Sequence, residues 1–181
     1  MRRYHLFIGI ILLTVISCGT SKERYSEAEL EALDVMVQKK EFRIESNFAY
    51  PQTTTALQSV LNSGILQPGS SAGAISLIGN YNFLSISKDS ISSHLPYFGE
   101  RQMMVNYGGR DGAITFNGLY EDFSAEKNNN SSYTINLIAK SNKEPFNVVI
   151  NIFPNLKADM MLFGAGRMSI QYTGVVVTDK K

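Results

Sequence analysis

The sequence predicts a mainly β protein at the margin of the α+β class: an antiparallel β-sandwich or barrel of about 8–10 short strands with one N-terminal amphipathic helix. Short runs of alternating apolar and polar residues recur along the chain, separated by Gly, Asn, Pro and Asp residues at hairpin spacing. No helical pattern interrupts these runs, so the crossover helices of a parallel sheet have no place in the chain. A sandwich and a barrel both fit these observations.

Residues 1–17 are typical of a signal peptide. A basic pair precedes an apolar run, Leu6–Ile16, which is shorter than the roughly 20 residues of a membrane-spanning helix. The Val15-Ile16-Ser17-Cys18 segment resembles the bacterial lipobox, which implies a diacylglycerol thioether on Cys18, cleavage before it, and acylation of the new amino group by a fatty acid such as palmitate. Cys18 is the only cysteine, so no disulfide competes for its thiol. The alternative is an uncleaved N-terminal anchor.

The residues after the cysteine predict an outer-membrane lipoprotein that faces the periplasm. Gly19 stands where some Gram-negative lipoproteins retained in the inner membrane have Asp. The lipidated tether, residues 18–25, lacks a dense acidic run, which favours the periplasmic side over display on the cell surface. Residues 26–181 have the size of a single domain. The membrane, contacted through the lipidated N-terminus, is thus the first expected partner.

The domain is expected to begin with its one helix. Ser26 and Glu29 match a capping box, and Leu33 and Val37 follow at helical spacing, which predicts an amphipathic helix over residues 27–39.

From Glu41 the period changes to two, which predicts a half-buried strand that Pro51 ends. The residues expected on one side of this strand are Phe42, Ile44, Ser46, Phe48 and Tyr50. The Gly- and Ser-rich segment 62–74 is predicted as a loop, 108–112 as a hairpin, and Glu121-Asp122 as part of a polar stretch between strands. Further strands are expected at about 75–79, 81–87, 90–95, 103–107, 113–117, 132–140, 146–153, 160–163 and 168–177.

The residue types present argue against several functions. Cleavage of the signal peptide leaves His94 as the one histidine, so a zinc site built from several His and Cys ligands is not expected. A serine hydrolase would have to use His94, and the chain has no Gly-x-Ser-x-Gly elbow to supply its nucleophile. The net charge is +1 without a basic stripe, so nucleic acid is not an expected partner. We therefore expect no metal, no cofactor and no enzymatic activity.

The segment SHLPYFGER, residues 93–101, is the most particular stretch of the domain. Pro96 cannot donate to a sheet ladder and Gly99 allows conformations closed to other residues, so a structural corner is expected. A binding edge is the alternative, because loop residues on a rigid scaffold often carry function. The candidate binding residues are His94, Tyr97, Phe98 and Arg101, together with Arg110 at the tip of the predicted 108–112 hairpin.

A second, separate feature is the triplet Asp89-Ser90-Ile91. It resembles the acceptor triplet for periplasmic O-glycosylation in some anaerobic Gram-negative bacteria, and Ser90 would be the modified residue. Its position at a predicted exposed turn of an exported protein is the context that such a modification requires. An ordinary hairpin turn is the alternative reading of the same residues.

Several segments together resemble a known family. They are Phe42-Arg43-Ile44 through Phe48-Ala49-Tyr50-Pro51, then Asn80-Tyr81, Lys88-Asp89-Ser90, Leu95-Pro96-Tyr97-Phe98-Gly99, Gly112-Ala113-Ile114-Thr115-Phe116, and finally Arg167 with Ile170-Gln171-Tyr172-Thr173-Gly174. From about residue 34 to residue 177 the chain resembles domain of unknown function 4251, a family of small bacterial lipoproteins. Glu100 stands before Arg101, where the family usually continues directly with Arg. The resemblance implies location and a single domain, and no activity.

Three functions are compatible with the sequence. The first is a membrane-anchored, non-enzymatic domain that binds an envelope protein or another partner, or supports the envelope. The second is a carrier or sensor of a small apolar or carbohydrate ligand, held in the interior or mouth of a barrel. The third is a hydrolase that uses His94 with a nearby acid.

Overall fold

The fold is that of a computed structural model, which describes residues 25–52, 54–55, 58–59, 68–71, 73–100, 112–141 and 144–177. The predicted signal peptide, Cys18, the predicted strand at 103–107, Arg101 and Arg110 lie outside the described residues.

One helix and a set of antiparallel strands make up the described part of the chain, which confirms the predicted fold class. The elements are α2 (Glu27–Lys39), β1 (Glu41–Pro51), β2 (Ile75–Ser76), β3 (Phe83–Ser87), β4 (Ser90–Pro96), β5 (Ala113–Ile114), β6 (Asn117–Leu119), β7 (Glu121–Lys127), β8 (Tyr133–Ser141), β9 (Glu144–Ile152), β10 (Lys157–Gly164) and β11 (Ile170–Val177).

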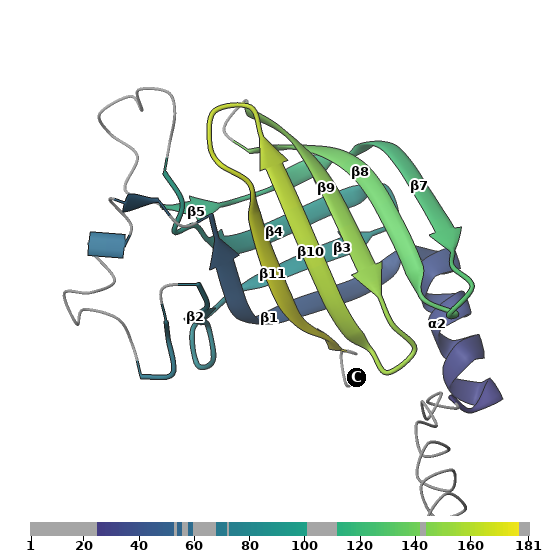
Figure 1. The fold of residues 1–181 in the computed structure, drawn as a ribbon. Coiled ribbons are helices and arrows are strands. Elements are labelled where there is room, and N and C mark those ends of the chain that lie inside the picture. Colours follow the sequence, from purple (N-terminus) through teal and green to yellow (C-terminus); the bar gives the residue numbers. More distant parts are fainter. Residues whose placement is uncertain are drawn as a thin grey trace, which may run out of the picture.

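The strands form a single curved sheet in a sandwich-like arrangement. Its order is β5-β4-β3-β1-β11-β10-β9-β8-β7, with β2 paired to β1 and β6 paired to β4. Figure 1 shows β8 to β11 crossing in front of β3 and β4, with α2 at one end beside β7 and β8. Strand β6 pairs with β4 in one layer, and β7 pairs with β8 in the other. Only Tyr120 separates β6 from β7, so residues 117–127 link the two layers.

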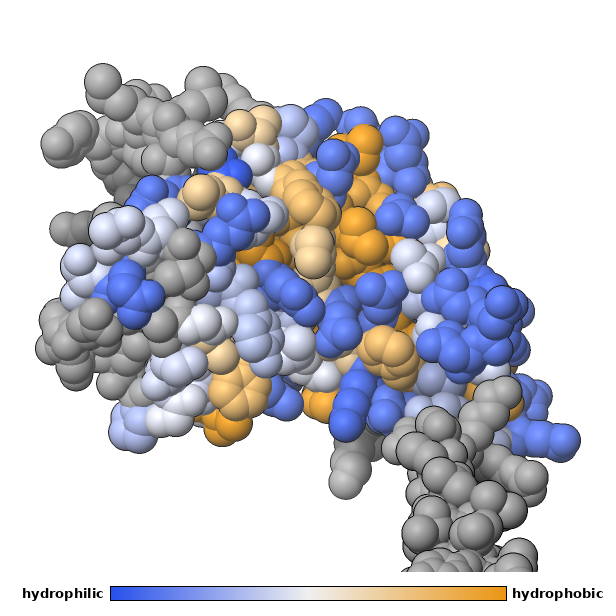
Figure 2. Space-filling view, in the orientation of Figure 1, coloured by the Kyte–Doolittle hydropathy of each residue, from blue (hydrophilic) through white to orange (hydrophobic). Residues whose placement is uncertain are grey.

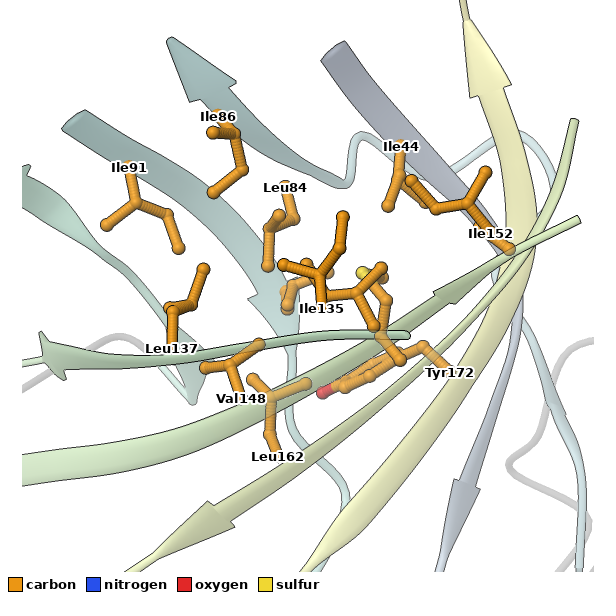
Figure 3. Packing of buried hydrophobic residues seen from close by; sticks show 14 of the residues in the cluster. Ile44, Leu84, Ile86, Ile91, Ile135, Leu137, Val148, Ile152, Leu162 and Tyr172 are labelled. Atoms are coloured by element: carbon orange, nitrogen blue, oxygen red, sulfur yellow. The ribbon is translucent and has the colours of Figure 1, made fainter. Parts of the chain in front are cut away.

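The core lies between the two layers. Ile44, Leu84, Ile86 and Ile91 point from one layer toward Ile135, Leu137, Val148 and Leu162 of the other, and all eight side chains are at most 2% exposed (Figure 3). Inward residues alternate along each strand, as expected when one face of a sheet is buried and the other meets water. The interior between the layers is therefore filled by side chains.

Helix α2 has the bounds predicted for it. Ser26 donates its backbone N–H to Glu29 Oε2 (2.8 Å), and Ser26 Oγ accepts from the Glu29 N–H (3.2 Å), which completes the capping box and lowers the pKa of Glu29. Asp34 accepts hydrogen bonds from Lys127 Nζ (2.7 Å) and Tyr133 Oη (2.9 Å). The Lys127 contact lowers the pKa of Asp34 against the opposing effect of burial. These bonds tie the helix to the β7–β8 hairpin.

Strand β1 contains a bulge that overturns part of its predicted pattern. The register shifts between Ser46, opposite Gly174, and Phe48, opposite Thr173, so Asn47 is the extra residue. One extra residue reverses the alternation of side chains. Beyond it Ala49 is buried, and Phe48 and Tyr50 lie on the outer face, not on the side of Phe42 as predicted.

The side chain of Asn82 completes the hydrogen bonding at this bulge. Its Oδ1 accepts from the Ser46 N–H (2.7 Å), and its Nδ2 donates to the carbonyl oxygens of Ser46 (3.0 Å) and Asn80 (3.1 Å). Asn82 thus takes the place of a neighbouring strand where the ladder between β1 and β3 ends.

Three strand predictions need correction. Glu121 and Asp122 open β7, whereas the sequence places them between strands. Every described side chain of β7 is exposed or half-buried, so the strand has no alternating pattern to detect. The strand predicted at 113–117 is interrupted between β5 and β6, and the one predicted at 160–163 is the middle of the longer β10.

Candidate functional site

The SHLPYFGER segment turns a corner after β4 and is held by two tyrosine hydroxyl groups. Tyr172 Oη donates to the carbonyl oxygen of Pro96 (2.8 Å). Tyr97 Oη lies 2.9 Å from the carbonyl oxygens of Glu100 and Met168 and has one proton to donate between them. A Cβ on Gly99 would lie 2.7 Å from Tyr97 Cζ, so a larger residue at this position would require the Tyr97 ring to shift.

A buried ion pair lies next to this corner. Arg167 Nη2 donates to Glu144 Oε2 (2.6 Å) and Arg167 Nε donates to the same oxygen (3.0 Å), while the side chains are only 8% and 19% exposed. The guanidinium carbon lies 5.0 Å from the centre of the Tyr97 ring and 5.2 Å from that of Phe146. Such distances are those of cation–π contacts. Arg167 Nη1 is buried, and no group of the described residues is hydrogen-bonded to it.

The corner residues therefore serve mainly to join strands. Tyr97 links the end of β4 to the β10–β11 connection, and Phe98 packs partly buried against the core. Burial raises the pKa of Tyr172 above its ordinary range, so its hydroxyl stays protonated and remains a donor. The expectation of a structural corner agrees with these contacts, and neither tyrosine is positioned as a free ligand-binding group.

His94 lies on the outward face of β4, the face that points away from the core. It pairs in register with Phe83 of β3, and both rings are near Tyr81: the Tyr81 and His94 ring centres are 5.7 Å apart, and the Tyr81 and Phe83 centres 5.5 Å. Tyr81 is 70% exposed. Among the described residues, no hydroxyl or carboxylate group is hydrogen-bonded to the imidazole of His94, so they give the hydrolase hypothesis no geometric support.

Arg43 and a set of serines extend this aromatic cluster. The Arg43 guanidinium carbon lies 3.9 Å from the centre of the Phe83 ring, and its Nε is 3.4 Å from Glu45 Oε1. Beyond the Phe83–His94 pair, toward the β3–β4 turn, the outward positions are serines in register, Ser85 with Ser92 and Ser87 with Ser90. Because serine side chains are short, they form a low floor beside the rings. We refer to Arg43, Tyr81, Phe83, His94 and these four serines as the outer trough.

A groove of about 440 Å³ opens beneath α2, at the end of the sheet where β1 begins and β3 ends. Its apolar surface comes from Ala32, Met36, Phe42, Ile86, Leu156 and Val176. Arg43, Glu41, Ser85 and Ser87 add polar groups. The volume falls within the range of about 300–1,000 Å³ that is usual for ligand pockets. Arg43, Ser85 and Ser87 belong to both the groove and the outer trough, so the two features are continuous.

A third surface feature lies over β8 to β11. Figure 2 shows an apolar centre on this face surrounded by hydrophilic residues. Met161 and Phe163 of β10 are 37% and 42% exposed, and Val149 pairs with Met161 in register. Asp159 lies on the same strand, and burial raises the pKa of its carboxyl group.

The predicted site residues thus have separate positions. His94 belongs to the outer trough, whereas Tyr97 and Phe98 belong to the corner near Arg167. Ser90 begins β4, and its hydroxyl group donates to the Ser87 carbonyl oxygen (2.8 Å). The glycosylation of Ser90 stays a prediction. The sequence did not indicate Arg43, Tyr81 or Met36 as binding residues, because alternation along a strand or helix does not reveal which outward residues are neighbours.

The described part of the chain contains no group of three or more His, Cys, Asp or Glu side chains that could hold a metal ion. Within the same residues, no helix is long and apolar enough to cross a bilayer.

The family model of DUF4251, a domain of unknown function, matches residues 24–176. The chain belongs to this family. A crystal structure of a DUF4251 family protein from Bacteroides eggerthii has a similar fold, with a TM-score of 0.56 at 9% sequence identity over 83% of this chain and 87% of that one. No curated protein matches the sequence of this DUF4251 protein. The family resemblance seen in the sequence is thereby confirmed.

Proposed function

We propose that this DUF4251 protein is a lipid-anchored, non-enzymatic binding domain of the outer membrane, facing the periplasm, and that it holds the apolar part of a small ligand in the groove beneath α2. The observation that carries the proposal is the groove itself, with an apolar wall and polar groups at one side. Ligand sites commonly combine these two features. Side chains of the described residues pack between the two layers, so we place the ligand in this groove at the end of the sheet and not between the layers.

The proposed anchor rests on Cys18 and the segment before it. The helix begins at Glu27, so a short tether would connect the lipid to the domain. Several buried acyl chains, at about 0.8 kcal/mol per buried methylene, hold a protein firmly to a bilayer.

The Cys18→Ala variant is expected to leave the membrane fraction or to accumulate as an uncleaved precursor, because it lacks the thiol that accepts the lipid. Radiolabelled palmitate incorporation and membrane fractionation measure this directly. Ser21→Ala is the matched control and is expected to behave as the wild type. Normal processing and membrane retention of the Cys18→Ala variant would show that the anchor is not a Cys18 lipid.

Met36→Trp is expected to fill the groove and to reduce a co-purifying small ligand by about 10-fold or more, which corresponds to about 1.4 kcal/mol. Met36 is half-buried and lines the groove, so a larger ring at this position occupies the ligand volume. Mass spectrometry of extracts from protein isolated out of its native envelope measures the ligand.

Val35→Trp is the matched control, because Val35 directly precedes Met36 in the helix, is 40% exposed and does not line the groove. It is expected to retain the ligand. Thermal unfolding confirms that both variants are folded. Wild-type protein without any small ligand, or equal retention by the two variants, would contradict the proposal.

A further inference from the structure

We infer that the outer trough is a subsite for an uncharged saccharide, with the ring of Tyr81 as the surface on which a pyranose stacks. This inference goes beyond the groove: the trough shares Arg43, Ser85 and Ser87 with it but centres on Tyr81, Phe83 and His94, which do not line the groove. It rests on four observations: an exposed aromatic ring that is held in place, a neighbouring guanidinium, a floor of hydroxyl groups, and the balance of charge.

The aromatic surface is exposed but fixed in position. Tyr81 is 70% exposed, and its ring contacts both Phe83 and His94, whose own positions are set by the β3–β4 ladder. A tyrosine offers a large, rigid contact area at a small cost in conformational entropy. A pyranose ring presents C–H groups on one face, which pack against such a ring, and hydroxyl groups around its edge.

The polar groups lie where those hydroxyl groups would be. A serine hydroxyl group can donate one hydrogen bond and accept two. The Ser90 hydroxyl already donates to the Ser87 carbonyl oxygen, so toward a ligand it serves as an acceptor. Ser85 and Ser92 face outward in register directly after the Phe83–His94 pair, and Ser87 and Ser90 follow. From Phe83 to Ser87 the strand spans about 13 Å at about 3.3 Å per residue. The floor is therefore long enough for a short oligosaccharide.

The charges of the trough favour an uncharged ligand. The guanidinium of Arg43 lies over the Phe83 ring and close to Glu45, and Glu41 stands on the same side of β1. This leaves no surplus of positive charge for a phosphate or sulfate group. Arg43 still has N–H groups beyond the contact with Glu45, and these suit the hydroxyl groups of a sugar.

The inference is tested with full-length lipidated protein in a detergent without a sugar headgroup, because maltoside or glucoside detergents would compete. The probes are three uncharged oligosaccharides, cellohexaose, mannohexaose and N-acetylated chitohexaose, titrated by calorimetry. At least one is expected to bind the wild type. Tyr81→Ala is expected to weaken this binding by about 10-fold or more.

Tyr50→Ala is the matched control. Tyr50 is another outward tyrosine of the sheet, but it lies on β1 opposite Gln171, away from the trough. It is expected to bind as the wild type does. Absence of binding by all three probes, or equal binding by Tyr81→Ala and the wild type, would overturn the inference.

The outcome also separates this inference from the proposed function. Met36→Trp is expected to keep saccharide binding, because Met36 lies in the groove and not in the trough. If the saccharides fail to bind while the small ligand still co-purifies with the wild type and not with Met36→Trp, the saccharide subsite is wrong and the groove proposal stands.

Discussion

Gly174→Ala is expected to lower the free energy of unfolding by about 3 kcal/mol or more, the upper range for an overpacked core position. A Cβ at this position would lie 2.7 Å from Ser46 Cα and 2.8 Å from the carbonyl carbon of Glu45, and closer still to the Glu45 carbonyl oxygen. These are main-chain atoms, so a change of rotamer cannot relieve the contact. Strand β1 itself would have to move away from β11.

The position matters because Gly174 faces the β1 bulge, at the pairing between β1 and β11. Moving β1 there also disturbs the hydrogen bonds between Asn82 and Ser46. Chemical denaturation measures the effect. Gly73→Ala is the control, because no atom lies within 4 Å of a Cβ built there, and it is expected to change stability by less than about 0.5 kcal/mol. Equal denaturation midpoints for the two variants would show that β1 and β11 are not tightly packed at the bulge.

Glu144→Ala is expected to cost about 3–5 kcal/mol, because it leaves the guanidinium of Arg167 buried without its counter-charge. The Arg167 side chain is 8% exposed, and its Nη1 already has no hydrogen-bond partner among the described residues. The Gly166 N–H, which donates to Glu144 Oε1 (2.9 Å), would lose its acceptor as well. Thermal or chemical unfolding measures the loss.

Two comparisons make this result specific. Glu121→Ala removes an ion pair with Lys140 in which both side chains are about 60% exposed, and it is expected to cost less than about 1 kcal/mol. Combining Glu144→Ala with Arg167→Met removes both charges and is expected to recover part of the stability. If Glu144→Ala costs no more than Glu121→Ala, the corner does not depend on the buried pair.

Local signals in the sequence predicted the elements whose patterns are strong. The helix over 27–39 has the predicted bounds because a capping box marks its start and an apolar stripe marks its face. Strands such as β8 and β9 alternate cleanly between buried and outward residues, so they were also predictable. Strand β7 escaped prediction because its side chains are exposed or half-buried on both faces and carry no such signal.

The candidate sites depend on pairings that no local pattern contains. Arg167 meets Tyr97 because the β10–β11 connection lies against the end of β4, and it meets Glu144 because β9 pairs with β10. In the same way, Arg43 reaches Phe83 because β1 pairs with β3 after a long excursion of the chain. The sequence suggested His94 as a candidate, and its neighbours in the trough became apparent only with the register of β3 and β4.

By itself, the sequence determined the fold class, the helix, most strands and the family, because alternation, capping and turn residues act over a few neighbouring positions. The tertiary structure decided which layers face each other, where the β1 bulge reverses the side chains, and which outward residues gather into the groove and the outer trough. These depend on strand register, and a shift of a single residue moves a side chain from the core to the surface.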